Sequence, residues 1–278
     1  MSYEGQNARE IHYAPCRYGQ SQLVFRGPES RLDEPFVAFL GGNETYGKFI
    51  EAPFPVLVER HLGLKCVNFG VQNAGIDVFL NDEPLLKIAA QAEATVLQVV
   101  GAHNMTNRYY AVHPRRNDRF LSASAMLQSI YPEADFAEFH FTKHMLRALY
   151  GVSDRRFASI RRELQHAWVA RMKLLIGKIP GTVVLVWFAE HRPQREEGPG
   201  SDPVGVAEPV FVTVEMLEEL RPLVRNIVEI VPSQEALAAR TDGMVFGDME
   251  APAAQRLFGP AAHGEVASAM SAVLQDLL

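Results

Sequence analysis

The sequence has only two cysteines, Cys16 and Cys66, too few for a disulfide framework or a cysteine-built zinc site. It has no run of about 18 apolar residues of the kind that forms a membrane-spanning helix. Residues 1–10 are polar and lack the apolar stretch of a signal peptide. These absences predict a cytoplasmic protein with two unreactive thiols and no membrane partner.

Positive charge is also scarce. The chain holds 27 Lys and Arg against 33 Asp and Glu, a formal net charge of −6 that argues against a general nucleic-acid binder. The charge is uneven, because residues 105–173 hold twelve Lys and Arg against six Asp and Glu. This local excess of +6 leaves −12 on the rest and predicts a basic body on an acidic scaffold.

Short apolar runs alternate with helical patterns, which is typical of a parallel sheet covered by helices. Strands are predicted at 36–40, 65–69, 94–100, 182–188 and 226–231, and helices at about 46–62, 84–92, 153–176 and 264–278. Ser233 is expected to cap a further helix. We predict one α/β domain over residues 1–278, a flavodoxin-like three-layer sandwich with about five parallel strands.

Two stretches interrupt this alternation. Residues 105–175 show several helical patterns and no convincing strand, so they predict a basic helical insertion within the domain. Residues 192–209 are rich in proline, glycine and charge and are interpreted as a surface loop.

Three predicted strands end in loops of glycine and amide residues, at 41–47, 68–75 and 101–108. Each loop alone is explained by turn geometry, because glycine and asparagine suit tight turns. Together, at neighbouring ends of parallel strands, they predict one concave surface of N–H donors that suits an oxyanion.

The order and spacing of these loops resemble the SGNH, or GDSL-type, hydrolases. The resemblance places Asn43 at the nucleophilic serine, Gly70 at the glycine of the second block, and Gly101 with Asn104 at the third block. In that family the serine N–H, the glycine N–H and the asparagine side chain hold the oxyanion. The resemblance therefore implies an SGNH-hydrolase-like fold with an oxyanion pocket formed by Asn43, Gly70 and Asn104.

Two departures bear on the mechanism. An amide such as Asn43 cannot become an attacking oxyanion at neutral pH, so ordinary serine hydrolysis is not expected. The Asp-x-x-His pair of the family is missing, and His263 falls after its position, although it could still reach the pocket. Thr45, Cys66 and Ser233 are weak substitutes for the nucleophile, since each has a simpler structural role.

Basic and aromatic residues follow the third loop. His103, Arg108, His113, Arg115 and Arg116 are candidates to bind an anionic or carbohydrate-linked ligand, or they form a solvated basic face. His140 and His144 have the i, i+4 spacing of a metal pair but no third ligand. We therefore predict no metal and no cofactor.

Three functions stay open. The first is a pseudoenzyme that binds a small anionic molecule or glycan in the oxyanion pocket without hydrolysing it. The second is a hydrolase or acyl- or sulfuryl-type transferase in which His263 or His103 activates water or an acceptor hydroxyl. The third is a protein-interaction module that docks through the basic insertion. Nucleic acid is not an expected partner, and a homo-oligomer is compatible with the sequence.

Overall fold

The computed structural model describes residues 11–195, 204 and 208–278. Residues 1–10 and most of the predicted surface loop at 192–209 lie outside this part of the chain. No helix in the described ranges combines the length and the apolar character needed to cross a bilayer.

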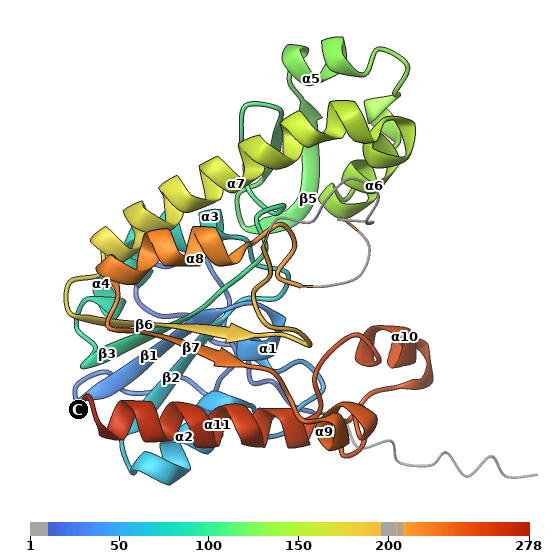
Figure 1. Cartoon of the computed structure of the whole chain (residues 1–278). Helices are drawn as coiled ribbons and strands as arrows, with labels where there is room; N and C mark the ends of the chain where they lie inside the picture. The colour runs from blue at the N-terminus through green and yellow to red at the C-terminus, as the bar shows by residue number, and fades with distance from the viewer. Residues whose placement is uncertain (1–10, 196–203, 205–207) are drawn as a thin grey trace, which may run out of the picture.

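Five parallel strands form the central sheet (Figure 1). They are β1 (Phe36–Gly41), β2 (Lys65–Gly70), β3 (Ala94–Gln98), β6 (Thr182–Phe188) and β7 (Asn226–Ile230). Their spatial order is β2-β1-β3-β6-β7, which is the flavodoxin-like order in which the first two strands exchange places. The predicted fold class is confirmed, and each predicted strand lies within two residues of its observed bounds.

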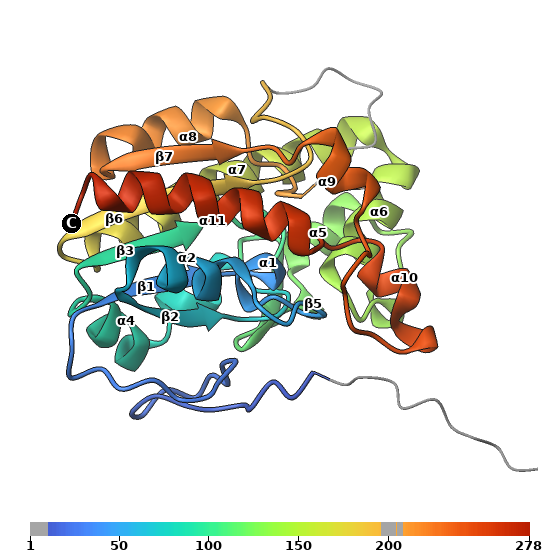
Figure 2. The ribbon, with the colours of Figure 1, turned by 90° about the horizontal axis from the view of Figure 1, so that it is seen from below.

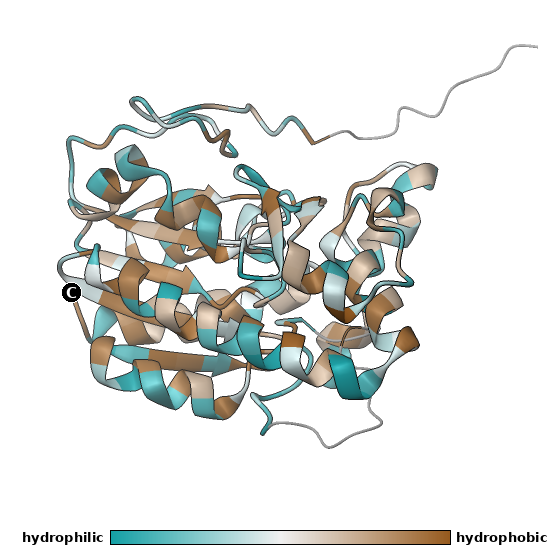
Figure 3. Ribbon diagram, turned by 90° about the horizontal axis from the view of Figure 1, so that it is seen from above, coloured by the Kyte–Doolittle hydropathy of each residue, from teal (hydrophilic) through white to brown (hydrophobic). Residues whose placement is uncertain are grey.

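Helices cover both faces of the sheet (Figures 1 and 2). On one face lie α2 (Phe54–Leu62) and α11 (Pro260–Gln275); on the other lie α3 (Ile76–Leu80), α4 (Glu83–Ala89), α7 (Asp154–Gly177) and α8 (Val214–Leu220). Each face packs an apolar cluster against the sheet. In Figure 3 the strands are largely apolar, whereas the outer helices alternate between apolar and polar residues.

The predicted helix over 46–62 corresponds to α2 alone, preceded by a separate short helix that reaches only Tyr46. α1 (Asn43–Tyr46) ends at Gly47, whose φ of +71° is the left-handed conformation that glycine adopts without strain. α2 begins after Pro53 and ends at Gly63, as expected for a helix stop. The prediction was wrong because the turn at Gly47 interrupts an apolar pattern that continues on both sides.

The expected all-helical insertion contains a two-stranded antiparallel hairpin, β4 (Tyr110–His113) and β5 (Arg116–Ala123). It continues into α5 (Ala125–Ile130), a 3-10 turn η1 (Phe136–Glu138) and α6 (Thr142–Val152) before α7 returns to the sheet. Alternation in β5 is irregular and its pairing register shifts twice, which explains why no strand was predicted.

The remaining elements are short: α9 (Gln234–Ala238), α10 (Ala251–Ala254), η2 (Arg221–Leu223) and η3 (Asp248–Glu250). The predicted cap of α9 is confirmed, because Ser233 Oγ accepts the N–H of Ala236 at 3.1 Å. Ser233 therefore has a structural role.

Candidate functional site

Asn43 and Asn73 join the ends of β1 and β2. Asn43 Oδ1 accepts the backbone N–H of Asn73 at 2.9 Å, and Asn43 Nδ2 donates to Asn73 Oδ1 at 3.1 Å. Asn73 has a φ of +54°, a conformation that asparagine tolerates better than most residues. Its own amide donates to Asp118 of the β5 strand at 3.4 Å. The first two loops and the hairpin therefore meet.

Gln98, at the end of β3, holds the α1 turn through both atoms of its amide. Oε1 accepts the N–H of Gly42 at 2.9 Å and the hydroxyl of Thr45 at 2.7 Å. Nε2 donates to Glu44 Oε2 at 2.8 Å. Gln98 is only 4% exposed, so its amide is fixed in the core and orients Glu44 at the end of the sheet.

Glu44 is a partly exposed carboxyl with a perturbed proton affinity. Desolvation, with a smaller contribution from the charge of Glu208, raises the pKa of the Glu44 carboxyl above its ordinary value, although the hydrogen bond from Gln98 opposes the shift. A carboxyl raised in this way is suited to exchange protons nearer neutral pH.

His103 and Glu208 lie together beside Gly101. His103 Nε2 is 3.9 Å from Glu208 Oε1, and Lys143 Nζ of α6 is 3.0 Å from the same oxygen. A Cβ on Gly101 would lie 2.7 Å from His103 Nδ1 and 2.9 Å from Glu208 Oε2, so a side chain there would displace one of these groups. Glu208 reaches the strand ends from the segment before α8.

Burial keeps His103 neutral. The side chain is 5% exposed, and desolvation lowers its pKa to about 4. Its Nδ1 is buried and has no hydrogen-bond partner among the described residues. We assign the imidazole proton to Nε2, which faces Glu208, and Nδ1 is then a bare acceptor. The pKa of Glu208 lies below its usual range; desolvation opposes this shift, and the charge and hydrogen bond of Lys143 favour it.

We call Asn43, Glu44, Asn73, Gln98, His103 and Glu208 the strand-end cluster. Two other predicted oxyanion groups lie next to it. Asn104 is 7% exposed, and its Oδ1 accepts from the Thr142 hydroxyl at 2.6 Å, so Nδ2 is the atom that can donate to a ligand. The N–H of Gly70 donates to Asn68 Oδ1 at 2.8 Å, so it is already used within the protein.

His263 does not belong to the cluster. It is 1% exposed and lies in the apolar core that includes α2 and α11, with ring contacts to Phe54 and Phe188. Its Nδ1 accepts the N–H of Phe54 at 3.1 Å, at the first turn of α2. Desolvation and the charge of Arg26 lower the pKa of His263 to about 3. The sequence left open whether His263 reaches the pocket; in the structure this ring is a neutral acceptor in the apolar core.

The predicted cationic ligands are separated. Arg108 pairs with Glu163 of α7 at 2.8 Å. His113, Arg115 and Arg116 lie at the turn of the β4–β5 hairpin, where His113 Nδ1 accepts the N–H of Arg115 at 3.2 Å. Desolvation raises the pKa of the Asp118 carboxyl, and the charge of Arg116 opposes this shift. His103 is neutral, Arg108 is paired with Glu163, and the other three residues lie at the hairpin turn. The five residues expected to bind an anionic ligand therefore do not form one group.

The alternative nucleophiles and the histidine pair considered for a metal contribute to the packing of the protein. Thr45 is fully buried, and burial of the Cys66 thiol raises its pKa to about 12. The ring of His144 packs edge-on against Phe139. Within the described residues, no group of three or more His, Cys, Asp or Glu side chains is arranged to hold a metal ion.

Two cavities lie away from the strand-end cluster. One of about 620 Å³ separates α7 and α8, and one of about 570 Å³ lies between Tyr18 and Asp33 in the segment before β1. The cluster thus has converging polar groups, although neither of these cavities is lined by its residues.

The comparisons with known proteins place the chain in a family. A family model described as "Domain of unknown function (DUF6473)" matches residues 1–278. The chain belongs to the DUF6473 family. Comparison with curated proteins finds no match for this DUF6473 chain.

Two solved structures are similar to this DUF6473 chain. The lipase Lip_vut3 from a goat rumen metagenome is 12% identical, with a TM-score of 0.41 over 88% of this chain and 97% of that chain. The salicylyl-acyltransferase SsfX3 from a tetracycline biosynthetic pathway is 14% identical, with a TM-score of 0.34 over 90% of this chain and 55% of that one. Membership of the SGNH hydrolases, with Asn43 in place of the serine, stays a prediction.

Sequence reasoning missed Glu44, Gln98 and Glu208. Glu44 follows Asn43 directly, but the SGNH-hydrolase pattern described in the sequence gives that position no role. Gln98 is a polar residue inside an otherwise apolar strand, between Leu97 and Val99, and this was the available signal. Glu208 is more than 100 residues from the third loop, so only the fold brings it there.

Proposed function

We propose that the strand-end cluster is an acid–base site of hydrolase or transferase type that works without a serine nucleophile and takes a hydroxyl-bearing, carbohydrate-like ligand. The observation that carries the proposal is the contact from Gln98 Nε2 to Glu44 Oε2, because it fixes a proton-exchanging carboxyl at the carboxyl end of β1.

The absence of serine from the strand-end loops supports a direct mechanism. None of the loops at 41–47, 70–75 and 101–107 contains serine. Thr45 donates its hydroxyl to Gln98 and is fully buried, and the Asn43 amide is bound to Asn73. In the proposed reaction, ionised Glu44 takes a proton from water or an acceptor hydroxyl as its oxygen bonds to the reacting centre. The leaving oxygen regains that proton, and Asn104 Nδ2 stabilises the negative charge that develops on this oxygen before it is protonated.

The balance of donors and acceptors favours a hydroxyl-bearing ligand over an anion. Glu44 and Glu208 are acceptors, and Lys143 is already bound to Glu208. Asp118 adds a further carboxyl beside Asn73. An anionic group would meet carboxylates here, whereas hydroxyl groups can donate to them. This narrows the expected anionic or carbohydrate-linked ligand to its carbohydrate-like form.

The test combines binding and turnover. Saturation-transfer NMR would compare methyl β-glucoside with glucuronate, and p-nitrophenol release would be measured from p-nitrophenyl β-glucoside and p-nitrophenyl acetate. We expect the neutral glycosides to bind better than glucuronate, and p-nitrophenyl acetate to turn over no faster than in buffer. Glu44→Gln should abolish p-nitrophenol release from the glycoside, since glutamine cannot accept the proton.

Glu218→Gln is the matched control, because Glu218 lies on α8 and pairs with Arg221 at the surface. It should behave as the wild type. Preferential binding of glucuronate, no binding of the glycosides, or equal behaviour of Glu44→Gln and wild type on every probe would each contradict the proposal.

A further inference from the structure

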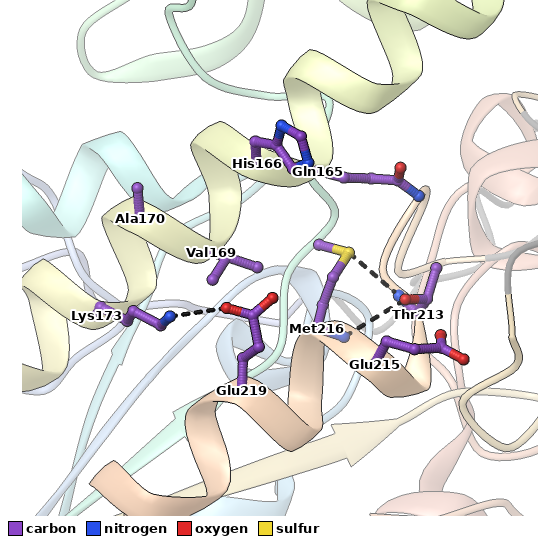
Figure 4. Close-up of a pocket in the computed structure, with 9 residues that line it drawn as sticks. All are labelled: Gln165, His166, Val169, Ala170, Lys173, Thr213, Glu215, Met216 and Glu219. Atoms are coloured by element: carbon purple, nitrogen blue, oxygen red, sulfur yellow. Dashed lines mark hydrogen bonds and ion pairs between the residues drawn. The ribbon is translucent and has the colours of Figure 1, made fainter.

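The cavity of about 620 Å³ between α7 and α8 is a second place where the structure can hold a ligand (Figure 4). Small-molecule sites commonly have volumes of a few hundred to about 1,000 Å³. The cavity lies on the helical layer, and its lining shares no residue with the strand-end cluster.

Its inner wall is apolar. Val169 of α7 and Met216 of α8 are 7% and 6% exposed, and the small side chain of Ala170 leaves the outer edge open. A flexible thioether such as Met216 adapts its shape to an aliphatic ligand. The wall therefore suits a body of several carbon atoms.

The polar lining is richer in acceptors than in donors. Lys173 Nζ pairs with Glu219 Oε2 at 2.7 Å across one end of the cavity (Figure 4). The charge of the lysine is therefore already balanced within the protein. Gln165 Nε2 donates to the carbonyl of Phe211 at 3.3 Å, which leaves its Oε1 as an acceptor. Thr213 Oγ1 already accepts from the N–H of Met216, as the cap of α8.

Glu215 adds a negative charge at the same end as Thr213. Its contact with Arg195 is 3.8 Å long between side chains that are 57% and 89% exposed, and an exposed pair of this kind contributes little. The other titratable lining group, His166, is exposed on α7, and its ring points away from α8 (Figure 4). With Glu219 neutralised by Lys173, the lining has one weakly compensated carboxylate.

We propose that this cavity binds a small organic cation, an ammonium group on an aliphatic body. The ammonium group donates to Glu215 and to Gln165 Oε1, and the aliphatic body packs on Val169 and Met216. An ammonium has three donors and no acceptor, which matches the lining. The proposal does not rest on the function of the strand-end cluster.

The test uses three probes with the same six-carbon body and different heads: hexylamine, hexanol and hexanoate. Chemical shifts of the ¹³C-labelled Met216 methyl group at neutral pH give the dissociation constants. We expect hexylamine to bind at least about tenfold more tightly than hexanoate, with hexanol between them.

Three variants separate the contributions. Glu215→Gln should weaken hexylamine several-fold and leave hexanol unchanged, because only the cation loses a charged partner. Glu218→Gln, its neighbour on the outer face of α8, should change neither. Ala170→Phe places a ring at the exposed edge of the cavity and should abolish binding of all three probes while the protein stays folded.

Equal affinity for hexylamine and hexanoate, or no shift of the Met216 methyl with any probe, would overturn the proposal. Unchanged hexylamine binding in Glu215→Gln or in Ala170→Phe would also overturn it, because the probe would then be bound elsewhere.

Discussion

Asn43 and Asn73 exchange two hydrogen bonds, so the side chain at the position compared with a nucleophilic serine joins two loops instead of facing a substrate alone. Asn43 Oδ1 receives a backbone N–H, and the amide nitrogen donates back. The pair gives Asn43 a role in holding the ends of β1 and β2 together, and Glu44 beside it has a carboxyl whose pKa is raised by desolvation.

Asn43→Ser should not create an esterase. The variant places a hydroxyl at the turn, but the ring of His263 is enclosed by Phe54 and Phe188 and cannot take its proton. Release of p-nitrophenol from p-nitrophenyl acetate should stay at the wild-type level. Loss of the hydrogen bonds to Asn73 should lower the free energy of unfolding by about 1–2 kcal/mol, measured in urea. New esterase activity that a phosphonate inhibitor removes would show that a base is within reach.

Glu44→Gln should be more stable than the wild type at neutral pH. The folded-state pKa of Glu44 is raised, so its contribution to stability is fully present below the unfolded value of about 4.3 and is lost as the pH rises through the folded-state pKa. Glutamine does not ionise, and its oxygen still accepts from Gln98. Urea unfolding at pH 3 and pH 7 checks this, and a gain that is the same at both pH values would argue against it.

Glu218→Gln is again the control in this comparison. The hydrogen bond and charge of Arg221 lower the pKa of Glu218, whereas the pKa of Glu44 is raised. This variant should show no gain in stability at pH 7.

His263→Gln should reduce the acid sensitivity of the protein. Burial lowers the pKa of His103 to about 4 and that of His263 to about 3, whereas unfolded histidine titrates near 6.5. Unfolding therefore takes up protons below about pH 6.5, and stability falls as the pH decreases from there toward 4. Removing one such group should make the slope shallower by up to about 1.4 kcal/mol per pH unit. The same slope in variant and wild type would mean that His263 is protonated in the folded protein.

Gly70→Ala should be destabilising, because a Cβ there would lie 2.3 Å from the backbone nitrogen of Tyr46. The backbone of α1 cannot move aside as a flexible side chain can, and we expect a loss of about 2–3 kcal/mol. Gly264→Ala is the matched change in open space, within α11, and should stabilise by about 0.5–1 kcal/mol. Thermal unfolding of both variants checks this pair, and a Gly70→Ala protein as stable as wild type would contradict the close approach of α1 to β2.

The sheet could be predicted because its central strands β1, β3 and β6 are buried on both faces. Residues 182–188 form a run of apolar and β-branched residues, and the predicted bounds match β6. The β4–β5 hairpin could not be found in this way, because its strands carry arginine, asparagine and aspartate and its register shifts. The break between α1 and α2 depends on the left-handed residues Gly47 and Phe49.

The site could be predicted only in part. The sequence indicated the loops at the ends of β1, β2 and β3, and the contacts of Asn43 with Asn73 and of Gln98 with Glu44 show that neighbouring strand ends do meet. The sequence could not show that His263 is a core acceptor, because a histidine near a chain end has the same pattern in both roles. Hydrogen-bond partners such as Asn68 for Gly70 depend on side-chain directions that residue spacing does not contain.

Residues 208–213 have one end at each of the two proposed sites. Glu208 reaches His103, the carbonyl of Val210 accepts the N–H of Ala102, and Thr213 lines the cavity between α7 and α8. A single short length of backbone therefore spans the distance between them. A molecule bound at one end that shifted this segment would change the affinity at the other, and thermodynamic reciprocity requires the influence to run equally in both directions.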